Sequence, residues 1–293
     1  MTWWVIVNPH AGRRGETERR TRLALAAVGV AHEVRVSARP EHVPQLVAEG
    51  RAAGCGDFAA VGGDGTAHLV LNGLMAEPWP SPPTLAILPA GSGSDFIRTF
   101  ALPKRLEDAA RHLATDSRYR CDVGVLEGDF GRRWFLNVAD MGIAAGSVLV
   151  ADALPRFFGG WRYRVGFWLY LARFGADEIE LVAGDHFYRG SAINVVAANG
   201  QFFGGGLNIA PRAAVTDGLF DIQVFTGPRR HAFTIMPRVP RGTHLGHRGV
   251  RRFTAAEFSL SCRPGWPVEA DGEVIGRGAV AGRVVPGAID FKI

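Results

Sequence analysis

Short apolar runs alternate with helix-period segments over the first part of the chain. Four runs are bounded by turn residues and too short for helices, so they predict buried strands; they are residues 3–7, 32–36, 58–61 and 85–88. Amphipathic helical spacing follows at residues 16–28, 41–53 and 66–75, and another helix is expected to begin at Asp95. Strand, loop and helix repeated in this order predict an α/β domain with a mostly parallel sheet.

The first predicted helix shows which side chains are expected in the core. Leu23 and Ala27 are four residues apart, so both are expected on the inner face. Arg19, Arg20 and Arg22 are expected to face water.

The pattern changes after Cys121, where short strand-like stretches separated by turn residues dominate. These stretches are residues 122–126, 134–138, 178–182, 191–198, 220–225, 253–261 and 280–293. Helical spacing recurs only near residues 162–174 and 230–238. The pattern predicts an antiparallel β-sandwich. We therefore expect two domains, residues 1–123 and residues 124–281.

Composition indicates a folded globular protein but does not identify the molecule that it binds. The 293 residues are 47% hydrophobic and 21% charged, which excludes a disordered chain. The formal charge of +5 suits nucleic acid, an anionic membrane or a phosphorylated substrate equally. Three cysteines without CxxC spacing indicate reduced thiols and a cytoplasmic location. No signal peptide is evident, and the apolar stretch 141–151 is shorter than the roughly 20 residues that span a bilayer.

Three glycine-rich loops follow predicted strands and precede predicted helices. They are Asn8–Gly15, the Gly-Gly-Asp-Gly-Thr segment at 62–66, and the Pro-Ala-Gly-Ser-Gly-Ser-Asp-Phe segment at 89–96. Backbone N–H groups at such bends, together with helix N-termini, can hold a phosphate. Because parallel strands end at the same edge of a sheet, we expect the three loops to lie together.

Each loop also has a plainer interpretation. Asn8-Pro9 is ordinary turn chemistry, and Asp64 or Asp95 could simply cap a helix. Asp64 could instead hold Mg²⁺ beside a nucleotide's phosphates. The loops do not carry the lysine of a Walker motif, the Gly-x-Gly-x-x-Gly of a dinucleotide fold or the protein-kinase motifs.

Further motifs follow in the second half of the chain. They are Asn199-Gly200, Phe203–Gly206, Ile209–Pro211, Asp217–Asp221 and Asp271-Gly272-Glu273. With the three loops, in this order, they make the whole chain resemble the diacylglycerol kinase catalytic-domain family. This family includes bacterial diacylglycerol kinases and sphingosine kinases.

The resemblance implies a fold related to NAD kinase and diacylglycerol kinase. It implies a nucleotide-binding α/β domain, a lipid-substrate β-sandwich and an active site between them, with segment 282–293 returning to the first domain. ATP contacts are implied at Asn8, Pro9, His10, Ala11, Gly12, Ser37, Gly62, Gly63, Asp64, Gly65, Thr66, Ala67, His68, Leu69, Gly91, Ser92 and Gly93.

A structural Mg²⁺ is also implied by the resemblance. Its ligands would be the Asp217 carboxylate and the main-chain carbonyls of Ala214 and Leu219. Asp-Gly at 217–218 is also a common turn that need not hold a metal.

Asp271 and Glu273 resemble the family's base segment, where a carboxylate accepts the proton of a lipid hydroxyl. Two residues apart on a strand, they would point to the same side unless Gly272 turns the chain. In the sphingosine-kinase branch, the acid matching Asp64 takes this role. Exposed acids on a β-turn are the alternative.

Several positions depart from the family pattern: Ala11, Ser92, Ser94, Leu69 and Ala144 replace a serine, a threonine, an asparagine, a glutamate and an aspartate. The hypothesis is nevertheless an ATP- and Mg²⁺-dependent lipid kinase. The alternatives are a small-molecule kinase of the NAD kinase type and a catalytically weak nucleotide- or lipid-binding regulator.

The expected partner is a lipid substrate at a membrane surface, without nucleic acid and without a transmembrane segment. A homodimer and peripheral attachment at the inner membrane face are also expected. Residues 154–174 interleave aromatic residues with arginines, a pattern typical of interfacial helices and equally of a helix packed on the sandwich.

Overall fold

The computed structural model describes residues 2–12, 15–91, 94–155 and 161–293. By its internal contacts the chain divides into two units. Unit one comprises Met1–Val123 and Pro286–Ile293, and unit two comprises Gly124–Val285.

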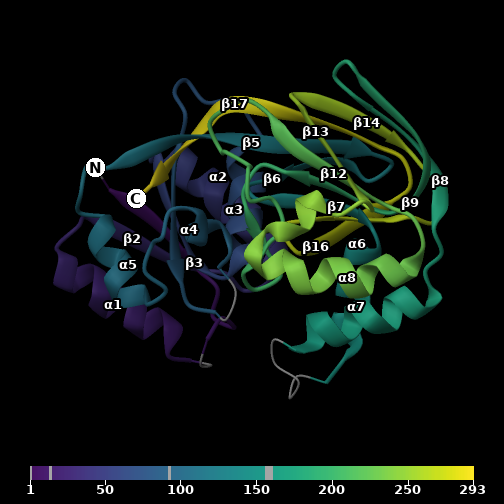
Figure 1. The fold of residues 1–293 in the computed structure, drawn as a ribbon. Coiled ribbons are helices and arrows are strands. Elements are labelled where there is room, and N and C mark those ends of the chain that lie inside the picture. The colour runs from purple at the N-terminus through teal and green to yellow at the C-terminus, as the bar shows by residue number, and fades with distance from the viewer. Residues whose placement is uncertain (1, 13–14, 92–93, 156–160) are drawn as a thin grey trace. The chain divides into compact units, whose positions relative to one another are not determined.

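A parallel sheet forms the centre of unit one, as the sequence pattern predicts (Figure 1). Its strands are β1 (Trp3–Val7), β2 (His32–Val36), β3 (Asp57–Gly62) and β4 (Thr84–Pro89). The second half of β17 (Val280–Lys292) pairs in parallel with β4, which gives the order β17-β4-β3-β1-β2. Because β1, β3 and β4 are buried along their whole length, they read as continuous apolar runs.

Five α-helices connect or flank these strands in the described part of unit one. They are α1 (Thr17–Val28), α2 (Val43–Ala52, preceded by the 3₁₀ turn η1, Pro40–His42), α3 (Asp64–Leu74), α4 (Phe96–Thr99) and α5 (Leu106–His112). Helix α3 begins two residues earlier than predicted, so the second glycine loop is short and its acid belongs to the helix.

The expected inner face of α1 is wrong. Leu23 is 59% exposed and Ala27 is also exposed, whereas Thr21 and Leu25 are buried. The inner stripe includes threonine because the Thr21 hydroxyl donates to the Thr17 carbonyl at 2.7 Å, which allows it to be buried. The expectation that Arg20 faces water is also only half right, because its guanidinium binds Glu107 of α5 at 2.7 Å.

Antiparallel strands form unit two, which confirms the predicted sandwich class. The strands are β5 (Arg118–Gly128), β6 (Gly131–Phe135), β7 (Val138–Gly142), β8 (Asp177–Ala183), β9 (His186–Ala198), β10 (Phe202–Phe203), β11 (Leu207–Asn208), β12 (Phe220–Thr226), β13 (Val250–Ala255), β14 (Glu257–Ser261), β15 (Pro267–Ala270) and β16 (Glu273–Arg277). The main path is β16-β15-β7-β9-β8-β14-β17, and β12 pairs with both β9 and β13. Trp266 and the inward residues of these strands form the core.

Helices also occur where the sequence analysis expects none. Helix α6 (Ile143–Ala153) covers an apolar stretch whose residues show no polar face, so its period is invisible in the sequence. The expected helices correspond to α7 (Trp161–Arg173) and to a series of short turns: η3 (Arg229–His231), α8 (Ala232–Ile235), η4 (Met236–Arg241) and η5 (Thr243–Gly246). Within the described residues, no helix is both long and apolar enough to span a membrane.

Candidate functional site

The three glycine loops of unit one lie together at the carboxyl edge of the parallel sheet. After β1, the Asn8 N–H donates to the Val61 carbonyl of β3 at 3.0 Å. The Asn8 side-chain amide donates to the Thr66 hydroxyl at 3.2 Å, which joins the first loop to the start of α3. The first and second loops are therefore fixed to each other by both backbone and side-chain hydrogen bonds.

The third loop lies against the other two. The Ala90 N–H donates to the Gly62 carbonyl at 3.0 Å. A Cβ at Gly12, where φ is +68°, would stand only 2.4 Å from the Ala90 carbonyl oxygen. Glycine at this position therefore permits the close approach of the first and third loops.

Asp64 connects the second loop to the third. Its two carboxylate oxygens accept the Asp95 N–H at 2.8 and 3.1 Å. The interpretation of Asp64 as a helix cap is wrong, because Gly63 occupies the N-cap and no side chain caps α3. Asp95 precedes α4 without capping it and instead pairs with Arg98 at 2.9 Å. Asp64 thus holds the loop geometry from the first turn of α3.

The other positions expected to contact ATP differ in exposure. His10 is exposed and its N–H donates to the Asn8 carboxamide oxygen at 2.9 Å. Ser37 is buried at the end of β2, where its hydroxyl donates to the Val7 carbonyl at 3.3 Å. Ala67 and His68 are buried in α3, so their side chains belong to the packing of unit one. Ser92 and Gly93 lie outside the described residues.

These contacts build a site suited to an anion. The bends present main-chain atoms, and the N-terminus of α3 contributes the positive end of its dipole. Gly63 and Gly91 leave the backbone uncovered there, since a Cβ at Gly91 would be 3.7 Å from the Gly63 nitrogen. Phosphate oxygens are the ligands that such a cradle accepts.

Unit two contains a cluster of carboxyl groups around the β15–β16 hairpin. Asp271 and Gly272 form its turn with φ values of +51° and +87°. Asp271 accepts the N–H groups of Leu136 and Asn137 at 2.8 and 2.9 Å and that of Val138 at 3.3 Å. The left-handed backbone at a non-glycine residue is strained, and these three bonds hold it in place.

Gly272 turns the chain, so Asp271 and Glu273 do not share one side of a strand. Asp271 is half-buried in the turn, while Glu273 is exposed at the first position of β16. The two expected base candidates therefore differ in environment: the Asp271 carboxylate is half-buried and held by the main chain, and Glu273 is exposed.

Two buried acids support this hairpin, and sequence analysis did not single them out. Glu269 and Asp140 are paired positions on β15 and β7 and are 3% and 0% exposed. The Gly272 N–H donates to Glu269 Oε2 at 2.7 Å, and the Asn194 amide donates to Asp140 Oδ1 at 2.9 Å. The antiparallel register brings these residues together, and nothing in the local sequence signals it.

Burial determines the protonation of this pair. It raises the pKa of Asp140 to about 6, and burial together with the Asp140 charge raises the pKa of Glu269 well above its usual value. No N–H or hydroxyl of the described residues donates to Asp140 Oδ2. A proton on Glu269 would supply that donor, and the burial of both groups favours this protonated form of the pair.

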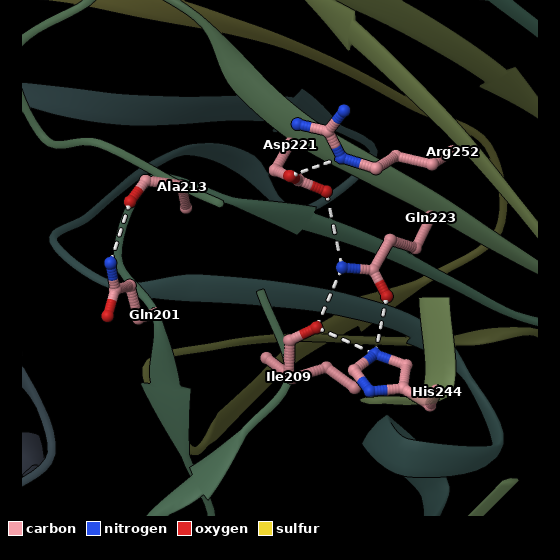
Figure 2. A network of polar contacts seen from close by, with 7 residues as sticks. All are labelled: Gln201, Ile209, Ala213, Asp221, Gln223, His244 and Arg252. Carbon is pink, nitrogen blue, oxygen red and sulfur yellow. Dashed lines mark hydrogen bonds and ion pairs between the residues drawn. The ribbon is translucent and has the colours of Figure 1, made fainter. Parts of the chain in front are cut away.

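The loop of the expected metal ligands is anchored by a buried polar network (Figure 2). The Gln223 amide donates to the Ile209 carbonyl at 2.7 Å and to Asp221 at 3.2 Å. His244 lies 2.9 Å from the same carbonyl, and Arg252 pairs with Asp221 at 2.6 Å. The network fixes both ends of the segment that contains Ala214, Asp217 and Leu219.

The donor groups of this loop suit a hard cation. Asp217 is exposed, and its Oδ1 accepts the Leu219 N–H at 3.0 Å, which shapes the turn. Carboxylate and carbonyl oxygens are the ligands that Mg²⁺ prefers, usually with several waters. Among the described residues no group of three or more His, Cys, Asp or Glu could hold a metal. A cation here would therefore depend on one carboxylate, main-chain carbonyls and water.

Comparisons with known proteins agree with this architecture. The diacylglycerol kinase catalytic domain family matches residues 2–126, and the YegS C-terminal NAD kinase beta sandwich-like domain family matches residues 137–292. A solved structure titled as a diacylglycerol kinase from Bacillus anthracis strain Sterne shares the fold, with a TM-score of 0.75 and 21% identity over 99% of this chain and 96% of that one.

Curated relatives carry a common name. A protein of Pseudomonas aeruginosa strain UCBPP-PA14 named "Probable lipid kinase YegS-like" is 30% identical over 97% of this chain and 92% of its own length. Relatives of the same name from Pseudomonas savastanoi pv. phaseolicola and Cronobacter sakazakii are 29% and 28% identical, over 89% and 67% of this chain and 83% and 64% of their own lengths. The chain therefore belongs to the diacylglycerol kinase catalytic-domain family of lipid kinases and is a phosphotransferase by class.

Proposed function

We propose that this protein transfers the γ-phosphate of ATP to a hydroxyl group of a lipid, with diacylglycerol or a related lipid as the acceptor. The observation that carries the proposal is the meeting of three glycine loops at one sheet edge, with Gly12, Ala90 and Asn8 in direct contact with neighbouring loops. A triphosphate is a ligand with enough charge and length to use several bends at once.

In this proposal the nucleotide binds along unit one. Asn8–Gly12, Ser37, Gly62–Leu69 and Gly91–Gly93 surround it, mainly through main-chain atoms. Asp64 holds the third loop through the Asp95 N–H, so it positions the phosphate-binding amides. Mg²⁺ bound by Asp217 and the carbonyls of Ala214 and Leu219 would contribute positive charge and stabilise the loop.

Asp271 is the proposed general base. The acceptor hydroxyl oxygen forms a bond to the γ-phosphorus, the bond from that phosphorus to the β–γ bridging oxygen breaks, and ADP leaves. The hydroxyl proton passes to the Asp271 carboxylate, which the main-chain N–H groups of Leu136, Asn137 and Val138 hold in place. Rigid placement by the main chain favours Asp271 over the exposed Glu273 and over Asp64.

The acceptor lipid is proposed to be presented at a membrane surface, where the protein would attach peripherally. A homodimer stays a prediction from the sequence analysis. At two of the departures from the family pattern the main chain is hydrogen-bonded: the Ala11 carbonyl accepts the Thr17 hydroxyl at 2.5 Å, and the Ala144 N–H donates to Asn194 at 2.9 Å.

The test is phosphate transfer from ATP labelled at the γ-position to a lipid panel in vesicles. The panel contains diacylglycerol, monoacylglycerol, a sphingoid base and a polyprenol, and the Asp64→Asn and Asp271→Asn variants serve as controls. Transfer to one of these lipids, lost in the variants, supports the proposal. Transfer only to soluble acceptors would identify a kinase of the NAD kinase type, and ATP binding without any transfer would identify a regulator.

A further inference from the structure

An exposed apolar patch lies on the helices of unit two. Trp168 of α7 and Phe233 of α8 are 38% and 64% exposed, and their rings stack with centroids 4.7 Å apart. Leu169, next to Trp168, is 50% exposed. We call Trp168, Leu169 and Phe233 the aromatic patch. Three large apolar side chains gathered at one place on the surface mark an interaction site more often than single exposed residues do.

The patch is held rigidly because the opposite faces of both helices are buried. Leu171 and Phe174 at the end of α7, and Ala232 of α8, belong to the sandwich core. The Arg229 guanidinium donates to the Ala172 carbonyl at 2.9 Å, which joins the C-terminal turn of α7 to the segment that leads into α8. Figure 1 shows α7 and α8 side by side. The exposed rings are therefore fixed features of the fold.

The segments that carry the patch are strongly basic. Residues 161–173 contain three arginines and residues 227–252 contain seven, and neither segment contains an aspartate or a glutamate. Exposed arginines among the described side chains of these segments are Arg173, Arg229, Arg230, Arg238, Arg241, Arg248 and Arg251. The net charge of the whole chain is only +5, so its positive charge is concentrated here.

We propose that the aromatic patch and the exposed arginines of its two segments dock unit two on an anionic lipid bilayer. The rings and Leu169 would enter the interface between headgroups and acyl chains, and the arginines would bind the headgroup phosphates. This docking proposal rests on the proposed function, because a lipid acceptor resides in the bilayer. A second copy of the chain fits less well, because two such patches would bring two acid-free, arginine-rich surfaces together.

The experiment is co-sedimentation of the full chain with vesicles, without nucleotide. Vesicles of phosphatidylcholine are compared with vesicles that also contain phosphatidylglycerol, at low and high salt. The variants are Phe233→Ser and Leu169→Ser for the apolar contact, and Arg230→Gln and Arg238→Gln for the charge. Phe187→Ser is the matched control, because Phe187 is 62% exposed beside the β8–β9 turn and outside both segments. Thermal unfolding of each variant checks that it is folded.

The wild-type chain is expected to bind the anionic vesicles and to lose binding as salt increases. Phe233→Ser and Leu169→Ser should each weaken binding about five- to tenfold, and each arginine variant about fivefold. Phe187→Ser should bind like the wild type. Equal binding by all folded variants, or equal binding to both vesicle types, would overturn the proposal. So would a patch variant that changes a dimer to a monomer in size-exclusion chromatography while vesicle binding stays the same.

The outcome is independent of the kinase assay. Vesicle binding without phosphate transfer would leave the docking surface in place and refute the proposed function. Phosphate transfer by a chain whose vesicle binding is unchanged in the patch variants would support the proposed function and refute the docking surface.

Discussion

The glycine loops of unit one and the hairpin of unit two achieve rigidity in different ways. In unit one, main-chain hydrogen bonds, the Asn8 amide and a single carboxylate, that of Asp64, connect the three loops, and glycine at position 12 allows a carbonyl to approach where a side chain would collide. In unit two, carboxyl groups hold the backbone: Asp271 binds three N–H groups and Glu269 binds a fourth. One region is therefore sensitive to added atoms, and the other to lost charge or hydrogen bonds.

The largest expected effect comes from the hairpin. Asp271→Asn should lower kcat by about 10²- to 10⁴-fold, because an amide cannot accept the hydroxyl proton. It should also lower the thermal midpoint, since an amide has one acceptor oxygen for the three N–H groups.

The Glu273→Gln variant distinguishes the role of Glu273 from that of Asp271. Glu273 is exposed, so its amide variant should retain the wild-type midpoint and most of kcat. If Glu273→Gln abolished transfer while Asp271→Asn only reduced stability, the roles proposed for these two residues would be reversed.

The next effect tests crowding in the loops of unit one. Gly12→Ala places a Cβ against the Ala90 carbonyl oxygen and should raise the KM for ATP about tenfold. The matched control is Gly54→Ala, because Gly54 also has a positive φ (+78°) but nothing within 4 Å of an added Cβ. Both variants carry the same backbone strain, so an equal rise in KM would show that loop contact is not the cause. Steady-state kinetics over a range of ATP concentrations measures both.

The buried acids make stability depend on pH. The pKa values of Glu269 and Asp140 are raised in the folded state, for Asp140 to about 6. Their contribution to the free energy of unfolding is therefore complete below the ordinary carboxyl pKa near 4, and it is lost as pH rises through the raised pKa values. Glu269→Gln mimics the protonated acid. We expect it to match the wild type near pH 4 and to become relatively more stable above it, by at most about 1.4 kcal/mol per pH unit.

Urea unfolding of the wild type and Glu269→Gln at several pH values measures this difference. A constant difference between them at every pH would show that Glu269 ionises in the folded protein as it does in the unfolded chain. The prediction concerns stability alone and is independent of which residue acts as base.

The smallest expected effect concerns the loop that contains Asp217, where Mg²⁺ is proposed to bind. Asp217→Asn should weaken the Mg²⁺-dependent rise in thermal midpoint, with a midpoint Mg²⁺ concentration about threefold higher, because one carboxylate is exchanged for a neutral oxygen ligand. Asp185→Asn is a suitable control, since Asp185 is an exposed acid in another turn of unit two. A Mg²⁺ response that is the same in both variants and the wild type would place the cation elsewhere.

Sequence predicts unit one better than unit two, and the reason is physical. Strands buried on both faces, such as β1 and β3, are unmistakable apolar runs, and parallel strands must bring their following loops to one edge. The prediction of the inner face of α1 was wrong because the buried stripe includes Thr17 and Thr21, whose hydroxyls donate to the main-chain carbonyls of Ala11 and Thr17.

Unit two contains features that no local pattern encodes. Helix α6 has only Ser147 and Asp152 as polar residues, and the β15–β16 hairpin consists of strands of only four and five residues. The Asp140–Glu269 pair exists only because two strands distant in sequence pair in one register. The motif at 271–273 was visible in the sequence, but the strained turn that separates its two acids depends on the N–H groups of residues 136–138.

Strand β17 determines the order in which the two units can complete their folding during translation. Its residues 290 and 291 pair with β4, and Phe291 is fully buried against Phe96. These residues follow all of unit two along the chain, so the ribosome must complete unit two before unit one receives its fifth strand. The glycine loops therefore leave the ribosome early, whereas the last strand of their sheet is added late. A nascent chain halted before residue 286 would expose the hydrophobic site that Phe291 normally fills.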